Sequence, residues 1–232
     1  MATKTSAPGR SPLHRVIGAL GAFYGRPKPP AVTDPFEQVL WENVAYLASD
    51  ERREQAWKRF KTEVGTKPAQ ILKASRSRLI DIGKAGIVPA STADKLRQIA
   101  EIAVEEFAGD LKPVLKLPLA QAKKALRKFP SIGEPGAERI LLFAGSHPVL
   151  ALDSNGLRVL LRLGFGREDK NYTKSYRSAR EAVAPGLPLD AAWLTRAHQL
   201  LRRHGQELCK TNHPRCDACP LQTDCAYLRS LQ

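Results

Sequence analysis

The four cysteines of this chain lie close together near its C-terminal end. They occur in the segment CKTNHPRCDACPLQTDC with the spacing C-x6-C-x2-C-x5-C, and the sequence contains no other cysteine. Four thiolates at short spacing can hold a zinc ion or an iron–sulfur cluster. Disulfides are disfavoured, because nothing resembles a secretory signal peptide and a chain of 232 residues can build a core without cross-links. Zinc ribbons usually pair two C-x-x-C knuckles, whereas this segment has only one.

A second candidate site lies between residues 128 and 164. The segment KFPSIGEPGAERILLF at 128–143 places a Pro-x-Ile-Gly turn between two predicted helices, and VLALDSNGLRVLLRLG at 149–164 contains Asp153. Such a turn lets backbone N–H groups at a helix N-terminus face a DNA phosphate, and Gly133 can take the positive φ angle that the turn needs. On these residues alone, any helical hairpin could carry this turn, and Asp153 could simply cap the helix that follows it.

A third group of polar residues lies on the segment DPFEQVLWENVAYLASDE at 34–51, which we predict to be helical. On a helical wheel Asn43 falls within the apolar stripe, with Glu42 and Tyr46 beside it. A buried amide needs hydrogen-bond partners, so Asn43 is either satisfied in the core or directed into a cavity. Helical spacing alone favours an ordinary surface position for Glu42.

Hydrophobic periodicity predicts that helices position all three groups. Apolar residues recur at intervals of three and four, for example over 36–47 and 194–201, and no alternating strand pattern competes with them. Proline and glycine interrupt the pattern at 26–30, 130–136 and 185–188. We therefore expect about ten short helices joined by tight turns in an all-α protein without internal repeats.

The chain is strongly basic. Lys and Arg number 37 against 23 Asp and Glu, a net charge of +14 that is spread along the sequence. This balance favours a polyanionic partner, most often nucleic acid, although many basic proteins bind none. Aromatic residues make up only 6 % of the chain, which disfavours a long stacking platform for single strands. The first twelve residues predict a disordered basic tail, with an organelle transit peptide as the alternative.

The cysteine spacing, the hairpin turn and the aspartate that follows it together resemble the endonuclease III family of helix-hairpin-helix DNA glycosylases, over roughly residues 13 to 228. The resemblance implies an all-α, two-lobed fold. A helical barrel lobe would span 34–147 and end in the hairpin, and 13–33 with 148–228 would form a cluster lobe. A [4Fe-4S] cluster would be held in the loop at 209–225 by four ligands: Cys209, Cys216, Cys219 and Cys225.

The resemblance also implies a binding partner and a cellular location. The expected partner is double-stranded DNA, and the protein is expected to be a cytoplasmic, nucleoid-associated monomer with no membrane contact. The predicted DNA-binding residues are Ser131, Ile132, Gly133, Gly136, Arg139, Arg158, Lys210 and Arg215. For Arg139 and Arg158, solvation of a helix surface explains the positive charge equally well.

The same resemblance implies chemical roles. Asp153 matches the aspartate that supports departure of the damaged base, either by stabilising the cationic sugar or by activating the attacking nucleophile. Glu42 falls near the catalytic glutamate of the adenine mismatch glycosylases, so a buried carboxyl there is a candidate general acid. Asn43, Tyr46 and Leu47 would line the base pocket, with Leu47 in place of the glutamine that many relatives insert into the duplex.

Two positions depart from the family pattern. The first hairpin glycine is replaced by Ser131, and the lysine that gives bifunctional members their strand-cleaving activity is replaced by Pro135. Proline has no amine to form a Schiff base, so a monofunctional glycosylase with weak or absent lyase activity is expected. The alternatives are a non-catalytic binder of distorted or abasic DNA, and a glycosylase with residual AP lyase activity. The nearby amines are Lys123, Lys124 and Lys128.

Overall fold

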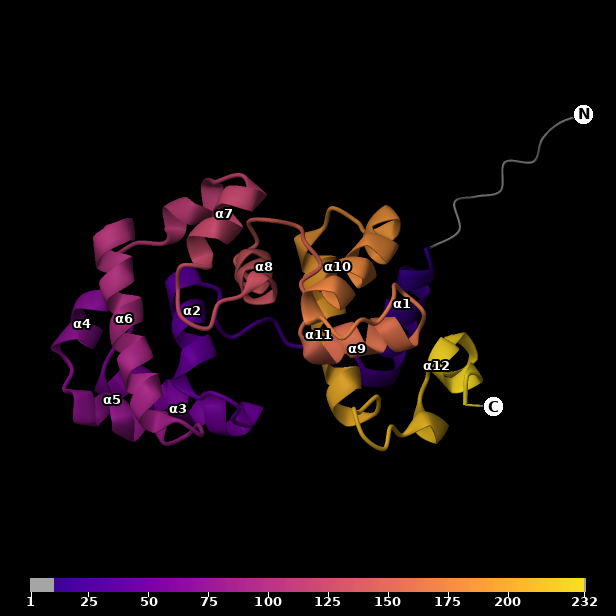
Figure 1. The fold of residues 1–232 in the computed structure, drawn as a ribbon, viewed down its shortest axis with the longest axis horizontal. Coiled ribbons are helices and arrows are strands. Elements are labelled where there is room, and N and C mark those ends of the chain that lie inside the picture. Colours follow the sequence, from indigo (N-terminus) through magenta and orange to yellow (C-terminus); the bar gives the residue numbers. More distant parts are fainter. Residues whose placement is uncertain (1–10, 232) are drawn as a thin grey trace, which may run out of the picture. The chain divides into compact units, whose positions relative to one another are not determined.

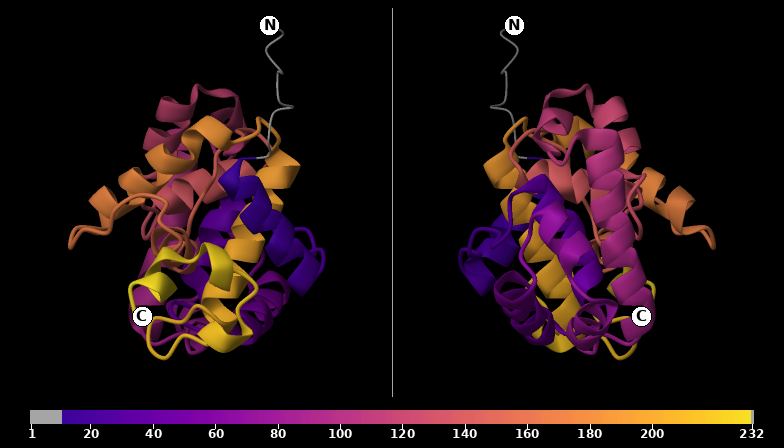
Figure 2. Two further views of the ribbon diagram at one scale, coloured as in Figure 1. Left: turned by 90° about the vertical axis from the view of Figure 1, so that its right-hand side faces the viewer. Right: turned by 90° about the vertical axis from the view of Figure 1, so that its left-hand side faces the viewer.

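The computed structural model describes residues 11–231, and over that range it consists of helices and loops without a β-strand (Figures 1 and 2). The all-α prediction is confirmed, and the described residues form twelve α-helices and four short 3₁₀ helices, where about ten helices were expected. The predicted tail falls mostly on residues 1–10, which lie outside the described part, and Pro12 already begins a helix. The described residues contain no helix with the length and apolar character needed to cross a membrane.

The chain divides into two compact units. Unit 2 comprises residues 30–147, and unit 1 combines the segment that ends at Pro29 with the segment that begins at Pro148. The helices of unit 2 are α2 (Pro35–Val44), α3 (Asp50–Glu63), α4 (Pro68–Lys73), α5 (Arg76–Gly83), α6 (Pro89–Phe107), η1 (Lys112–Lys116), α7 (Leu119–Leu126) and α8 (Glu134–Phe143). Several of them begin at a proline, whose missing N–H group would have no partner in the first turn of a helix.

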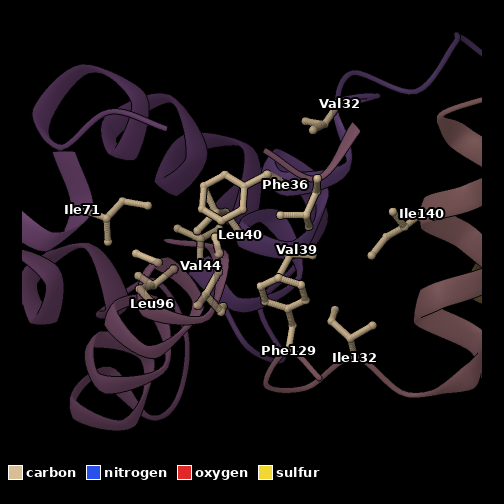
Figure 3. Close-up of a cluster of buried hydrophobic side chains, with 14 of the residues drawn as sticks. Val32, Phe36, Val39, Leu40, Val44, Ile71, Leu96, Phe129, Ile132 and Ile140 are labelled. Atoms are coloured by element: carbon tan, nitrogen blue, oxygen red, sulfur yellow. The ribbon is translucent and has the colours of Figure 1, made fainter. Parts of the chain in front are cut away.

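Helix α2 lies at the centre of the core of unit 2. Figure 3 shows its apolar side chains between Ile71 and Leu96 on one side and Phe129, Ile132 and Ile140 on the other. Full burial of a Leu, Ile or Phe side chain contributes about 1.5–3 kcal/mol. Because Phe129 and Ile132 belong to the hairpin turn and Ile140 to α8, this packing fixes the hairpin against α2.

Unit 1 is built from both ends of the chain. Its helices are α1 (Pro12–Tyr24), α9 (Ser154–Arg162), α10 (Tyr172–Val183), η2 (Ala184–Gly186), α11 (Ala191–Glu207), η3 (Cys216–Ala218), η4 (Gln222–Asp224) and α12 (Ala226–Arg229). Helix α1, indigo in Figure 1, packs against the orange α11. Helices α9 and α11 approach closely at Gly205, where an added Cβ would lie 2.7 Å from Cβ of Asn155.

A buried ion pair stabilises unit 2. The carboxyl of Glu138 is fully buried and accepts a hydrogen bond of 3.0 Å from Nζ of Lys123, which also donates to Glu134 at 2.6 Å. Removing one member of a buried pair costs about 3–5 kcal/mol, because the remaining charge loses its compensation. Lys123→Met is therefore expected to lower the free energy of unfolding by about 3 kcal/mol in urea denaturation.

The control for this prediction is Lys124→Met, which removes an exposed neighbouring charge. That change should alter the free energy of unfolding by no more than about 0.5 kcal/mol. Equal unfolding midpoints for the two variants would contradict a stabilising role for the Lys123–Glu138 pair.

Candidate active site

The predicted hairpin is present in unit 2, between α7 and α8, but its backbone differs from the expectation. The prediction that Gly133 takes a positive φ angle is wrong, because Gly133 precedes α8 in an extended conformation with φ −85°. The left-handed residue is Ser131, with φ 62°. A residue with a Cβ pays about 1–2 kcal/mol for this conformation. Nζ of Lys95 donates a 3.2 Å hydrogen bond to Oγ of Ser131 and so helps to hold the turn.

The N-terminus of α8 follows this turn directly. Gly133, the residue before the helix, supplies no side-chain cap to the first N–H groups. Uncapped N–H groups at the positive end of a helix dipole are suited to binding a phosphate. Pro135, which replaces the lyase lysine of the family pattern, lies within the first turn of α8, and Gly136 follows it.

Glu42 and Arg139 form an ion pair that connects α2 with α8. Nη2 of Arg139 lies 2.5 Å from Oε2 of Glu42, and each side chain is 19 % exposed. The Glu42 carboxyl, a candidate general acid, is therefore engaged by a guanidinium from α8. The structure therefore supports neither free solvation of Arg139 nor an isolated carboxyl at Glu42.

Asn43 is satisfied in the core, which is the first of the two alternatives that the sequence left open. Its side chain is buried, and Nδ2 donates to the carbonyl oxygens of Val39 and Pro130, both at 3.0 Å. The bond to Pro130 fastens the end of α2 to the hairpin turn. Asn43 thus holds the local structure together, and its amide is not directed into a cavity.

Tyr46 and Leu47, just beyond the end of α2, are exposed. Leu47 is 67 % exposed and has φ 56°, a left-handed conformation that is strained for a leucine. Ile87 is 63 % exposed, and its N–H donates to the carbonyl oxygen of Tyr46 at 3.3 Å. Gly86 permits this approach, since a Cβ there would lie 2.7 Å from the Tyr46 nitrogen. Strained backbone and exposed apolar side chains together are typical of a functional surface.

Sequence reasoning missed two residues of this surface. Ile87 comes from the segment between α5 and α6, and Nζ of Lys95 lies 5.4 Å from the centroid of the Tyr46 ring. Neither position has a motif of its own. The glycine immediately before Ile87 is the only sequence signal that could have drawn attention to it.

In unit 1, Asp153 is the N-cap of α9, and both of its carboxylate oxygens accept hydrogen bonds. Oδ1 accepts from the N–H of Gly156 at 2.7 Å, and Oδ2 accepts from Nδ2 of Asn155 at 3.1 Å. Nε of Arg202 lies 3.3 Å from Oδ2, and the Asp153 side chain is 15 % exposed. The capping explanation is thus correct, and the cap leaves part of the carboxylate accessible.

Arg158 is used within the protein. Its Nε donates to the carbonyl oxygen of Cys209 at 2.8 Å, and Nη2 donates to Gly205 O at 2.7 Å and to Asn155 Oδ1 at 2.9 Å. Burial lowers the pKa of Arg158. The guanidinium therefore ties the start of α9 to the cysteine segment. Lys210, in contrast, is exposed at the beginning of the cysteine loop.

The four cysteines line one pocket, together with Arg162, His204, Leu208 and Tyr227 among others. Nη1 of Arg162 lies 3.5 Å from Sγ of Cys209, and the Leu221 N–H donates to Sγ of Cys219 at 3.4 Å. Burial raises the pKa of the Cys216 and Cys219 thiols. Over residues 11–231, no three His, Cys, Asp or Glu side chains stand close enough to share a single metal ion. Arg215, predicted to face DNA, is exposed beside this pocket.

Comparison with known proteins finds similarity in sequence to endonuclease III and in fold to solved structures of DNA glycosylases. No family model matches the chain. Endonuclease III of Thermotoga maritima is 27 % identical over 197 residues, which cover 85 % of each protein. The solved structure of a trapped endonuclease III–DNA covalent intermediate matches with a TM-score of 0.76 at 18 % identity, over 100 % of this chain and 99 % of that chain. A thermostable thymine-DNA glycosylase matches with a TM-score of 0.74 at 17 % identity, over 94 % and 97 % of the two chains.

The fold is that of the helix-hairpin-helix DNA glycosylases. Together with the match to endonuclease III along most of the sequence, it makes the chain similar to endonuclease III in both sequence and fold. The resemblance drawn from the cysteine spacing and the hairpin is thereby confirmed. The replacement of the lyase lysine by Pro135 sets this chain apart from the family pattern.

Proposed function

We propose that this protein is a DNA repair glycosylase that hydrolyses the N-glycosidic bond of a damaged or mispaired base in duplex DNA. The observation that carries the proposal is the carboxylate of Asp153, which is fixed by the Gly156 N–H and the Asn155 amide and is still partly exposed. A fixed negative charge stabilises the positive charge that develops at C1′ of the sugar as the base departs. Water then completes the hydrolysis and leaves an abasic site.

Two of the three amines near the hairpin are held in ion pairs, which supports a water nucleophile. Burial acts to lower the pKa of Lys123, but hydrogen bonds to Glu134 and Glu138 outweigh it, so that the pKa is raised. A lysine needs its neutral amine to form a Schiff base, and this pairing opposes that form. Lys128 pairs with Glu106. Strand cleavage by the protein itself is therefore proposed to be weak or absent.

Duplex DNA is the proposed partner, and unit 1 carries most of the charge that would attract it. Unit 1 contains 18 Lys and Arg against 8 Asp and Glu, whereas unit 2 contains 19 against 15. The exposed Lys210 and Arg215 lie in the cysteine loop, and the uncapped start of α8 supplies N–H groups in unit 2. Cationic side chains and helix N-termini are the usual phosphate contacts of DNA-binding proteins.

The proposed cofactor is a [4Fe-4S] cluster held by Cys209, Cys216, Cys219 and Cys225. All four thiols line one pocket, which fits a group that takes four thiolates. The spacing favours this cluster over zinc, because zinc ribbons usually pair two C-x-x-C knuckles and this segment has only one. When bound, the cluster would organise the loop and supply a one-electron centre.

The experiment that tests the proposed function is base release from a panel of duplexes that carry single lesions or mispairs. We expect one substrate to be cut only after alkali treatment, because hydrolysis leaves an abasic site that alkali then cleaves. Cleavage without alkali would show that lyase activity is retained. Tight binding without base release from any duplex would contradict the glycosylase function and indicate a protein that binds distorted or abasic DNA without catalysis.

A further inference from the structure

Three side chains from distant parts of unit 1 form a hydrogen-bonded chain that ends at a cysteine. Tyr24 is the last residue of α1, His204 lies on α11, and Cys219 belongs to the cysteine loop. The hydroxyl of Tyr24 is 3.1 Å from Nδ1 of His204, and Nε2 of the same ring is 3.5 Å from Sγ of Cys219. The His204 side chain is 1 % exposed, so water does not compete for either nitrogen.

The positions of the protons in this chain follow from its chemistry. A neutral imidazole has one N–H donor and one acceptor nitrogen, and a phenol hydroxyl can donate to that acceptor. A cysteine that ligates iron is a thiolate without a proton, so Nε2 must be the donor to Cys219. Nδ1 is then the acceptor, and Tyr24 donates to it.

Tyr24 is itself held in place by α11. The guanidinium carbon of Arg203 lies 4.7 Å from the centroid of the Tyr24 ring, and Nη1 of Arg203 donates to the Tyr24 carbonyl oxygen at 3.2 Å. Nε of Arg203 in turn pairs with Glu207 at 2.7 Å. Arg203 thus contacts both the ring and the backbone of Tyr24, and the Tyr24 hydroxyl stays directed at His204.

We propose that Tyr24 and His204 are positioning residues that set the reduction potential of the iron cluster through the hydrogen bond to Cys219. The inference rests on the proposed cluster. Hydrogen bonds to ligating sulfur atoms withdraw electron density and stabilise the more reduced state, which raises the potential. Tyr24 acts one step further out, because its hydroxyl selects the imidazole tautomer that can donate.

The test compares the cluster potential in three variants of the full chain, with the electrode as the source of the electron. His204→Met removes the donor and keeps an apolar side chain of similar reach. Tyr24→Phe keeps the ring and removes only the hydroxyl. His204→Gln places an amide N–H at a position similar to that of Nε2, so it should restore the hydrogen bond.

We expect His204→Met to favour the oxidised cluster by about tenfold, a shift of about 59 mV to lower potential for one electron. Tyr24→Phe should shift the potential in the same direction by less, and His204→Gln should remain close to the unmodified protein. A matched control is Tyr172→Phe, which removes an exposed tyrosine hydroxyl from α10 of the same unit and should leave the potential unchanged.

A second readout reports the hydrogen bond directly. Pulsed EPR of the paramagnetic cluster in H₂O and D₂O should detect an exchangeable proton near Cys219 that is lost in His204→Met. Two results together would overturn the proposal: the same cluster potential in Tyr24→Phe as in the control, and an exchangeable proton that is still present in His204→Met. Because they come from different variants, the test stands even if one variant loads iron poorly. Protein isolated without iron would overturn both this proposal and the proposed cofactor, whereas base release in the panel of duplexes tests the glycosylase function separately.

Discussion

Replacing Asp153 by asparagine is expected to slow base release by about 10²- to 10³-fold while leaving the protein folded. Asparagine caps a helix as well as aspartate does, so the bond to the Gly156 N–H is kept. What is lost is the negative charge that balances the cationic sugar. The measurement is the single-turnover rate of base release from the substrate that the duplex panel identifies, with circular dichroism to confirm the fold.

The control for this variant is Asp190→Asn. Asp190 caps α11 in the same unit, and its carboxylate accepts hydrogen bonds from the N–H groups of Ala192 and Trp193. The chemical change is identical, so an effect of capping or of net charge would lower the rate in both variants. An unchanged rate in Asp153→Asn would remove Asp153 from the proposed mechanism.

Replacing Pro135 by lysine is expected to give the protein a covalent reaction that it otherwise lacks. Borohydride should trap the variant on DNA with an abasic site at least about tenfold more efficiently than the unmodified protein, because a lysine amine can form a Schiff base. Pro135 lies in the first turn of α8, where N–H groups have no partner within the helix. The substitution therefore does not disturb the helix.

Pro68→Lys is the control for trapping, since it also introduces a lysine at a proline in the first turn of a helix, here α4 of the same unit. Trapping by both variants would indicate a non-specific reaction of added amines. Failure of Pro135→Lys to react, with base release intact, would show that residue 135 is not where the family's lysine acts.

The parts of the site that sequence could predict depend on local patterns. The cysteine spacing predicted four thiols around one pocket, and helical periodicity predicted the all-α fold together with the helix that carries Glu42 and Asn43. These features can be predicted from sequence because a metal-binding loop and a helix face are each defined by residues close in sequence. The capping position of Asp153 was likewise visible from the residues that follow it.

The parts that sequence could not predict depend on partners far along the chain. A helical wheel placed Glu42 on one face of α2 but could not supply Arg139, which arrives on α8. Arg202 approaches Asp153 from α11, and Arg158 turns to the carbonyl oxygens of Gly205 and Cys209. These contacts are set by how α9 and α11 pack, and no motif near either arginine encodes that packing.

The construction of unit 1 from both ends of the chain determines the order in which the protein can fold on the ribosome. Helix α1 is synthesised first, but its buried face of Leu13, Val16, Ile17 and Leu20 packs in unit 1 with α11, which ends at Glu207. At about 5–20 residues per second, roughly 10 to 40 s of translation separate the two helices. Residues 30–147 can complete their own core during that delay, whereas α1 has to remain unpaired or be shielded by a chaperone. The cysteine loop emerges after both, so its four thiols can come together only after α11 has been synthesised.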